Sequence, residues 1–453
     1  MTRVDLIVIG TGPGGESLAN HAARAGLSVV AVDKHLVGGE CPYYGCIPSK
    51  MMLRGAHALA DAARLPAIGG EASIRPAWSR VAHRIRSEAT DDWDDTVAVD
   101  RLRDAGVTVH HGTGRLTGPG QVSVETAEGE TLTYEAARGV VLNPGTRPAV
   151  PPIPGLAQTP YWTNREAVAA ESVPAHLIVL GGGPIGCEMA QAFARFGSRV
   201  TIVEAAERLI SHDEPEAAAV LRDALVADGI RVLTGVSATG VEFDEGTFWL
   251  TLDTDERISA ERLLVAVGRT SNLDGVGLDS VGLDPRALHV DDRMRAADGL
   301  WVIGDVVGAG AYTHLSMYQS DVALHDLLGQ EWHAADYRAV PHVTFTDPEV
   351  AGVGMTEAEA REAGIDVVVG STDLGASSRA FTHGPGAAGV VKIVAERGTS
   401  TVVGASVAGP AGGEIVSMLV LAVHARVPVA TLRSMIYAYP TFHRAVESAL
   451  PEL

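Results

Sequence analysis

Two cysteines near the start of the chain are spaced for redox chemistry. Cys41 and Cys46 have four residues between them, within the run Gly-Gly-Glu-Cys-Pro-Tyr-Tyr-Gly-Cys-Ile-Pro-Ser-Lys at residues 38–50. This spacing is about one and a half turns of a helix. A helix start lowers the pKa of a thiol, and the resulting thiolate is the species that attacks a disulfide. The run therefore predicts a dithiol–disulfide couple.

Two other interpretations of the cysteine pair are inert buried thiols and half of a metal site. A structural zinc site has four ligands, often from a second cysteine or histidine pair, and no such pair follows in the sequence. The third cysteine, Cys187, is interpreted as a small apolar packing residue. We therefore expect no metal site. So few cysteines in so long a chain also favour a reducing cytoplasm over a secreted disulfide framework.

Residues 10–15 have the sequence Gly-x-Gly-x-x-Gly, with glycines at Gly10, Gly12 and Gly15. Such glycines permit a tight turn and the close approach of a pyrophosphate to a helix N-terminus, and Asp33 would accept hydrogen bonds from a ribose. A structural turn can carry the same glycines, but the surrounding pattern favours a dinucleotide site. The predicted elements are a strand over 5–10, a helix over 12–25 and a strand over 28–33.

The same strand, glycine loop and helix pattern returns in the middle of the chain, with glycines at Gly181, Gly183 and Gly186. It predicts a second dinucleotide site. The predicted elements are a strand over 177–181, a helix over 186–196 and a strand over 199–204.

Glu204, at the end of that last strand, bears on the choice of nicotinamide nucleotide. A carboxylate there bonds a free ribose 2′-hydroxyl and repels a 2′-phosphate, so NADH is favoured over NADPH. The nearest arginine downstream is Arg208, which alone is little basis for recognising a phosphate. The simpler interpretation of Glu204 is a solvated strand end.

The rest of the chain divides into recognisable stretches. An alternating pattern over 114–135 predicts an antiparallel insertion, and the proline-rich stretch 146–154 marks a domain boundary. Residues 415–423 are apolar but too short to span a bilayer, so they predict a buried helix. From about residue 333 no further glycine loop occurs, which indicates a third domain.

Composition excludes several partners. The 453 residues carry 35 basic and 56 acidic side chains, a formal net charge of −21, which disfavours nucleic acid and membrane surfaces. The start of the chain lacks the pattern of a signal peptide. The lysines are Lys34, Lys50 and Lys392, so a lysine at a special position is informative.

Together, the two glycine loops, the cysteine run ending in Ile-Pro-Ser-Lys and a late Gly304-Asp305 resemble one family. This is the flavoprotein pyridine nucleotide–disulfide oxidoreductases, which include dihydrolipoamide dehydrogenase, glutathione and mycothione reductases and mercuric reductase. The resemblance covers essentially the whole chain. Further matches lie at residues 268–272, 301–305 and 345–354.

The resemblance implies a role for each matched residue. The first glycine loop and Asp33 would hold FAD, and Asp305 its ribityl chain. Cys46 would be the flavin-proximal thiol and Cys41 the interchange thiol. Lys50 would lie near flavin N5 with Glu188 as its partner, where an ammonium stabilises negative charge. Further matched positions assigned to cofactor binding are Gly39, Gly145, Gly268 and Gly304.

The C-terminus departs from the family pattern His-Pro-Thr-x-x-Glu, in which the histidine is a general base. Here Tyr439 replaces the histidine and Arg444 the glutamate. A free tyrosine titrates near about pH 10 and is a poor base at neutral pH. His443 could substitute, with Glu447 four residues later on the same helical face. Mercuric reductases also have this tyrosine, but they carry a C-terminal cysteine pair, and no cysteine follows Cys187.

We therefore expect an α/β fold with two Rossmann-like dinucleotide-binding domains, one for FAD and one for NAD, and a C-terminal α+β dimerisation domain. The predicted function is an FAD-dependent, NADH-linked dithiol–disulfide oxidoreductase acting on a small or protein-borne disulfide, or in reverse on a dithiol. The family's third domain completes the partner's active site, so a homodimer is expected. Alternatives are an NADH:quinone, small-oxidant or mercuric-type reductase and a redox sensor without turnover. The predicted domains are 1–148 with 270–332 for FAD, 149–269 for the nicotinamide nucleotide and 333–453 for dimerisation.

Overall fold

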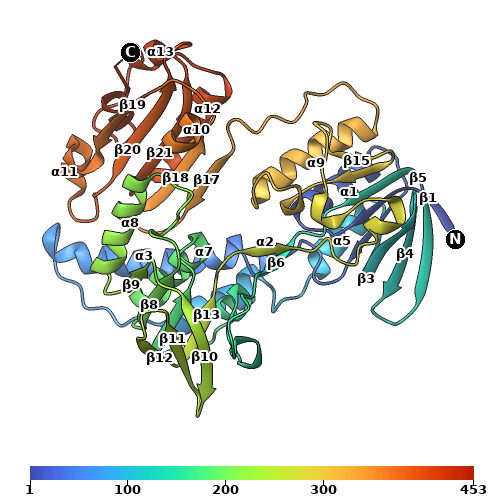
Figure 1. Ribbon diagram of the computed structural model, residues 1–453, viewed down its shortest axis with the longest axis horizontal. Helices are drawn as coiled ribbons and strands as arrows, with labels where there is room; N and C mark the ends of the chain where they lie inside the picture. The colour runs from blue at the N-terminus through green and yellow to red at the C-terminus, as the bar shows by residue number, and fades with distance from the viewer. Residues whose placement is uncertain (453) are drawn as a thin grey trace. The chain divides into compact units, whose positions relative to one another are not determined.

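The computed structural model describes residues 1–452, and the chain forms two compact units (Figure 1). The first unit comprises Met1–Pro48, Arg84–Arg147 and Arg269–Tyr337. The second comprises Ser49–His83, Pro148–Gly268 and Arg338–Leu453. Helix α3 (Cys46–Arg64) begins in the first unit and continues in the second.

The first unit is built on one sheet in which β1 pairs in parallel with β2 and β5, β2 with β3, and β5 with β16. Strand β4 is antiparallel to β3 and β5, as expected for the insertion, and β15 is antiparallel to β16. The elements are β1 (Thr2–Ile9), α1 (Pro13–Arg24), β2 (Val29–Asp33), α2 (Glu40–Tyr43), α5 (Thr96–Asp104), β3 (Val107–Gly118), β4 (Gln121–Thr126), β5 (Thr131–Leu142), β6 (Thr146–Pro148), β14 (Arg269–Ser271), β15 (Arg295–Ala297), β16 (Leu300–Val302) and α9 (Thr313–Leu327).

Apolar side chains explain why these strands lie inside. The end of β1 is fully apolar and buried, as is typical of a parallel strand covered on both faces. Helices α1 and α9 lie side by side on one face (Figure 1). Leu18 of α1 and Val322 of α9 join the same buried cluster as Leu6 and Val8.

The second unit contains the other glycine loop. Its parallel sheet has the order β13-β7-β8-β9, and an antiparallel sheet β10-β11-β12 shares its apolar core. The elements are α4 (Trp78–Arg84), α6 (Asn164–Val168), β7 (His176–Leu180), α7 (Pro184–Arg195), β8 (Arg199–Glu204), α8 (Pro215–Ala227), β9 (Arg231–Thr234), β10 (Ala238–Asp244), β11 (Thr247–Leu252), β12 (Arg257–Ala260) and β13 (Arg262–Val265).

The C-terminal part of the second unit, residues 338–452, is hereafter called the interface part, after the dimerisation role predicted for it. It contains an antiparallel sheet of order β17-β18-β21-β20-β19. Helix α12 packs along β18 and β21 (Figure 1). Its Leu419 belongs to the same buried apolar cluster as Val407 of β21. The elements are β17 (Pro341–Thr344), β18 (Glu349–Gly354), α10 (Glu357–Glu362), β19 (Val367–Asp373), α11 (Ser378–His383), β20 (Val390–Glu396), β21 (Val402–Gly409), α12 (Gly412–His424), α13 (Val429–Arg433) and α14 (Ala445–Ser448).

The structure agrees with the predicted α/β class, and both strand–helix–strand units lie within three residues of their predicted bounds, the largest difference being the start of β1. The apolar stretch 415–423 lies inside α12, as expected. The contacts group residues 49–83 with the second unit, whereas the predicted boundaries kept them in the first domain. Those predicted domain boundaries stay a prediction. Within residues 1–452, no helix is both long and apolar enough to cross a lipid bilayer.

Candidate active site

The first glycine loop is shaped by close backbone contacts. Gly10 has φ +92°, and a Cβ on it would lie 2.1 Å from the Asn143 carbonyl oxygen. A Cβ on Gly15 would lie 2.1 Å from the Gly10 carbonyl oxygen. Gly14 lets α9 pack closely against α1, because a Cβ on Gly14 would lie 2.3 Å from Ser316 Oγ. Any side chain at these positions would push β1, α1 and α9 apart.

Asp33 lies at the end of β2 and is buried. Its Oδ2 accepts hydrogen bonds of 2.7 Å from both the backbone N–H and the hydroxyl of Thr11. Its Oδ1 accepts a 2.8 Å bond from the His35 backbone N–H. The carboxylate therefore ties β2 to the glycine loop, and it is held where the resemblance assigns ribose recognition.

Gly304 and Asp305 follow β16, where the resemblance assigns the ribityl chain. Gly304 has φ +83°, and its N–H donates a 2.7 Å bond to the buried Gln319 side chain. Asp305 Oδ2 accepts a 2.7 Å bond from Thr146 Oγ1, which in turn accepts a 2.6 Å bond from Arg269. This relay holds the Asp305 carboxylate in one orientation.

The two cysteines lie in two separate helices rather than in one continuous helix. Cys41 lies in α2, and Cys46 is the first residue of α3. The Sγ of Cys46 lies 3.4 Å from Oγ1 of Thr313, the first residue of α9. Two helix N-termini therefore meet at Cys46, and their positive dipole ends favour a thiolate there.

The two thiols are not equivalent. A hydrogen bond with Cys46, burial and the negative charge of Cys46 raise the pKa of Cys41, and a hydrogen bond with Thr313 only partly opposes them. The expectation that a helix start lowers the pKa is wrong for Cys41. The pKa is raised because Cys46 is so close: a negative charge on Cys46 disfavours a second negative charge on Cys41.

Lys50 and Glu188 are in contact in the second unit. Lys50 Nζ lies 2.8 and 3.1 Å from the two carboxylate oxygens of Glu188, which is buried at the start of α7. Glu188 also accepts a 2.9 Å bond from the Phe345 N–H, and the ammonium lies 4.6 Å from the centre of the Phe345 ring. The pair fixes the direction of the lysine side chain while leaving about a third of it exposed.

A ladder of polar contacts that no sequence motif indicates continues along α7. The Gln191 side chain accepts a 2.7 Å bond from the Asp347 N–H and donates a 2.9 Å bond to the Asp347 carbonyl. Arg195 and Arg64 pair with the Asp347 carboxylate at 2.9 and 2.7 Å. Burial would raise the pKa of Asp347, but Arg195 and Arg64 outweigh it and hold that pKa below its usual value. The ladder fixes α7, and with it Glu188.

The second glycine loop repeats the geometry of the first. A Cβ on Gly181 would lie 2.4 Å from the Ala266 carbonyl oxygen, and one on Gly186 would lie 2.0 Å from the Gly181 carbonyl oxygen. A Cβ on Gly183 meets no protein atom within 4 Å. The first two glycines serve the fold, whereas Gly183 keeps space open beside the N-terminus of α7.

Glu204, the last residue of β8, contacts the same loop. One of its carboxylate oxygens accepts a hydrogen bond from the Gly182 N–H, and the other accepts a 2.7 Å bond from the Ala206 N–H. Arg208 donates to the backbone carbonyls of Ser211 and Asp213, at 2.6 and 3.2 Å. The guanidinium of Arg208 is therefore engaged with its own loop.

The C-terminal residues differ from the spacing expected for them. Helix α14 begins at Ala445, after His443, so His443 and Glu447 do not share a helical face. His443 Nε2 lies 3.0 Å from Met418 Sδ, while Glu447 pairs with Arg444 at 3.1 Å. Tyr439 is 68% exposed.

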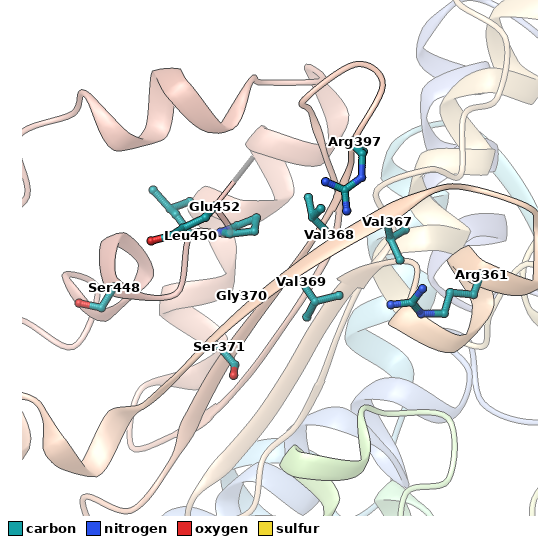
Figure 2. Close-up of a pocket in the computed structure, with 11 residues that line it drawn as sticks. Arg361, Val367, Val368, Val369, Gly370, Ser371, Arg397, Ser448, Leu450 and Glu452 are labelled. Carbon is teal, nitrogen blue, oxygen red and sulfur yellow. The ribbon is translucent and has the colours of Figure 1, made fainter.

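A cavity of about 590 Å³ opens elsewhere, on strand β19 of the interface part (Figure 2). Its two arginines are already paired, Arg361 with Glu357 at 2.8 Å and Arg397 with Asp366 at 3.2 Å. The described residues that line it include no residue assigned to the site from the sequence.

The remaining matched glycines are backbone positions. Gly39 caps α2 with φ +72°, and a Cβ on it would lie 2.7 Å from the Gly12 Cα. Gly145 and Gly268 have φ +64° and +123°, and a Cβ on either meets no protein atom within 4 Å. Gly39 therefore permits a close contact with the first glycine loop, and the other two leave open space.

Comparison with known proteins decides the family. Residues 4–335 match the model of the pyridine nucleotide-disulphide oxidoreductases, and residues 340–450 match the dimerisation domain of the same family. The chain belongs to this family. It is an enzyme of a class that depends on FAD and a pyridine nucleotide, and the resemblance seen in the sequence is confirmed. The dimerisation domain supports a homodimer.

Relatives of known activity cover the full chain. A dihydrolipoyl dehydrogenase of Haloferax volcanii is 34% identical over 99% of this chain and 96% of its own length. One from Thermus scotoductus is 34% identical, covering 100% and 98%. A mercuric reductase of Streptomyces lividans is 33% identical, covering 99% and 96%. These similarities span more than one substrate class.

Solved structures agree on the fold. The flavoprotein disulfide reductase RclA from Escherichia coli, induced by HOCl and solved as its Cu(II) complex, has a TM-score of 0.87 at 26% identity. LpdA from Mycobacterium tuberculosis has a TM-score of 0.87 at 25% identity. Each comparison covers 99% of both chains, so the expected fold class is confirmed.

Proposed function

We propose that the chain is an FAD-containing, NADH-linked dithiol–disulfide oxidoreductase. Its cysteines exchange electrons with a small or protein-borne disulfide, or run in reverse with a dithiol resembling dihydrolipoamide. The observation that carries the proposal is the Cys41–Cys46 pair. One sulfur lies at two helix N-termini beside Thr313, and burial and the neighbouring Cys46 raise the pKa of the other. This asymmetry supports different roles for the two residues, with Cys46 as the thiolate beside the flavin and Cys41 as the thiol that exchanges with the substrate.

The residues present fit both cofactors. Asp33, Gly304 and Asp305 would hold FAD, and the open space at Gly145 leaves room for it. Gly183 leaves similar space for a pyrophosphate at the N-terminus of α7, with Glu204 at the ribose. FAD, when bound, supplies two-electron transfer between NADH and the cysteine pair. Lys50, oriented by Glu188, would stabilise negative charge that develops during that transfer.

The engagement of Arg208 supports NADH over NADPH. A 2′-phosphate needs a cationic partner, and Arg208 already donates to Ser211 and Asp213. Glu204 would also repel a phosphate there. The carboxylate suits a free 2′-hydroxyl instead.

Disulfide exchange requires Cys41 to lose its proton. The Cys41 thiolate attacks one sulfur of the substrate disulfide, forming a mixed disulfide and releasing one thiolate. Cys46 then attacks Cys41, which restores the Cys41–Cys46 disulfide and releases the second thiolate. Two protons are taken up by the product. Because the pKa of Cys41 is raised, the exchange needs a base.

We propose His443 as that base, supplied across a homodimer, with Tyr439 as a hydrogen-bonding neighbour. The segment beside it supports an interface, because Ile436 is 99% exposed and Tyr439 is 68% exposed. His443 must turn away from Met418 to act.

An anaerobic NADH titration followed by visible absorption tests the proposal. We expect a long-wavelength thiolate-to-flavin charge-transfer band after the first two electrons. Cys46→Ser should abolish the band, whereas the matched variant Cys41→Ser should retain it. Flavin bleaching without the band in the wild-type protein would contradict the assignment of Cys46.

A second measurement isolates the proposed base. His443→Ala should slow disulfide turnover at least about tenfold while flavin reduction by NADH keeps its rate, since general bases contribute about 10²–10⁴-fold. Equal losses in both steps would mean that the variant damages the dimer instead.

A further inference from the structure

The loop between β8 and α8, residues 205–214, covers the second glycine loop. The Ile210 N–H donates a 2.8 Å hydrogen bond to the Gly182 carbonyl. The Leu209 side chain packs against Gly182, because a Cβ on Gly182 would lie 2.5 Å from it. The same loop begins directly after Glu204. Its conformation therefore determines the shape of the proposed nucleotide site.

This loop contains a strained residue. Ile210 is buried and has φ +38°, a left-handed conformation that is an outlier for a β-branched side chain. Such a conformation persists only when its surroundings over-determine it. The contact with Gly182 and the Asp213 N–H, which donates 2.9 Å to the Ile210 carbonyl, are part of that constraint. The rest comes from the interface part.

Lys392 of β20 anchors the end of the loop. Its buried ammonium lies 2.9 Å from three carboxylates, those of Glu214, Glu216 and Glu357. Glu214 is the last residue of the loop, and it also accepts a 2.6 Å bond from the Glu357 N–H. An ammonium with three diverging donors suits this arrangement, whereas the planar fork of an arginine does not. This explains a lysine at this position in a chain that uses arginine for nearly all of its positive charge.

A second contact joins the same loop to the interface part. Asp213 Oδ1 lies 2.9 Å from His342 Nε2 of β17. Asp213 and Glu214 are adjacent and both are buried. The loop is therefore bound to Gly182 at one end and to β17, β20 and α10 at the other.

We propose that Lys392 is a positioning residue for nicotinamide-nucleotide binding, acting through Glu214 and Ile210 on Gly182. The inference rests on the proposed function, because it takes the second glycine loop as the nucleotide site. The contacts of Lys392 with Glu214 and Glu216 are hereafter called the Lys392 latch. Without this latch, the loop relaxes at Ile210, and the fraction of molecules whose site can bind the nucleotide falls. The apparent dissociation constant rises in inverse proportion to that fraction.

Calorimetric titration of the FAD-loaded protein with NAD⁺ tests this directly. Lys392→Gln should bind NAD⁺ about tenfold more weakly, with FAD content unchanged. Adding Ile210→Gly to Lys392→Gln should restore binding to within about threefold, because glycine adopts a positive φ without strain. A merely structural role for Lys392 would not be rescued in this way. Arg257→Gln, which breaks the exposed pair with Glu242 in the same domain, is the matched control and should bind as the wild-type protein does.

Equal NAD⁺ binding by the wild-type protein and Lys392→Gln would overturn this proposal alone. Failure of the wild-type protein to bind NAD⁺ would overturn the proposed function and this inference with it. Where Lys392→Gln does not fold, Glu216→Gln removes one arm of the latch from a half-exposed carboxylate. It should weaken NAD⁺ binding about twofold to threefold, and unchanged binding would again overturn the proposal.

Discussion

The two glycine loops have the same backbone design but are held in place by different forces. The first loop is fixed within its own unit by close backbone packing, in which Gly10 and Gly15 lie against Asn143 and Gly14 lies against Ser316. Hydrogen bonds from Thr11 to Asp33 also hold it. The second shares the tight glycines, but its covering loop depends on charged contacts with the interface part.

The difference matches what each site must do. A resident cofactor favours a rigid, self-contained cradle, whereas a nucleotide that enters and leaves in each cycle favours a site whose covering loop can respond to its surroundings. The proposed FAD site relies on shape, and the proposed nicotinamide site relies also on ion pairs. A side chain at a close-packed glycine should therefore damage either loop, whereas a change of charge at the covering loop should damage the second site and leave the first intact.

Gly15→Ala should have the largest effect. Its Cβ would lie 2.1 Å from the Gly10 carbonyl oxygen, so α1 must separate from β1. We expect loss of FAD from the purified protein and loss of much of its folded fraction, measured by the flavin-to-protein absorbance ratio and by circular dichroism. The matched variant Gly183→Ala meets no protein atom and should retain FAD. A Gly15→Ala protein that retained its full FAD content would show that the first loop does not depend on this close approach.

Asp347→Asn should destabilise the second unit by about 3 kcal/mol at neutral pH, because Arg195 and Arg64 lose the carboxylate that they share. Arg195 then keeps its ion pair with Asp228, and Arg64 keeps its ion pair with the exposed Asp61. The folded pKa of Asp347 is depressed, so its contribution is fully present above the unfolded value of about 3.9 and is lost as pH falls through the folded value. Urea unfolding of both proteins between pH 7 and pH 3 measures this. The difference between them should shrink below about pH 4, and a constant difference would show that the loss is packing rather than charge.

Local spacing made part of this site predictable. Gly10, Gly186 and Glu204 belong to contiguous patterns, in which backbone sterics require glycine and a strand end places the carboxylate. The Gln191 ladder and the Lys392 latch were not predictable, since Lys392 and Glu214 are separated by 178 positions and meet only through tertiary packing.

The errors have the same origin as the omissions. The shift of Cys41 depends on the orientation of Cys46, and the helix expected to align His443 with Glu447 begins two residues too late. Spacing indicates which residues are near each other along an element. It does not indicate which neighbour carries a charge or where a short helix begins.

Glu204→Ala should reduce discrimination between the nicotinamide nucleotides by about tenfold, which corresponds to about 1.4 kcal/mol. Removing the carboxylate removes a ribose acceptor for NADH and the repulsion of a 2′-phosphate, so NADH should lose more than NADPH. The ratio of kcat/KM for the two nucleotides measures the change. Glu207→Ala removes an exposed charge from the same loop and is the control. An unchanged ratio in Glu204→Ala would remove the assigned role of that carboxylate.

Thr313→Val should have the smallest effect, and it probes the neutral contacts of the first unit. The Thr313 hydroxyl lowers the pKa of Cys41, so removing it leaves Cys46 and burial to raise that pKa further. Alkylation of reduced Cys41 by iodoacetamide should rise steeply only in the alkaline range, and in Thr313→Val it should be severalfold slower at any fixed pH near neutrality. Peptide mass spectrometry separates Cys41 from Cys46. Because NAD⁺ binding involves the other glycine loop, its dissociation constant should be the same in both proteins. A change in NAD⁺ affinity with no change in alkylation would mean that the hydroxyl acts on the second site, and that the two sites are held less independently than their contacts indicate.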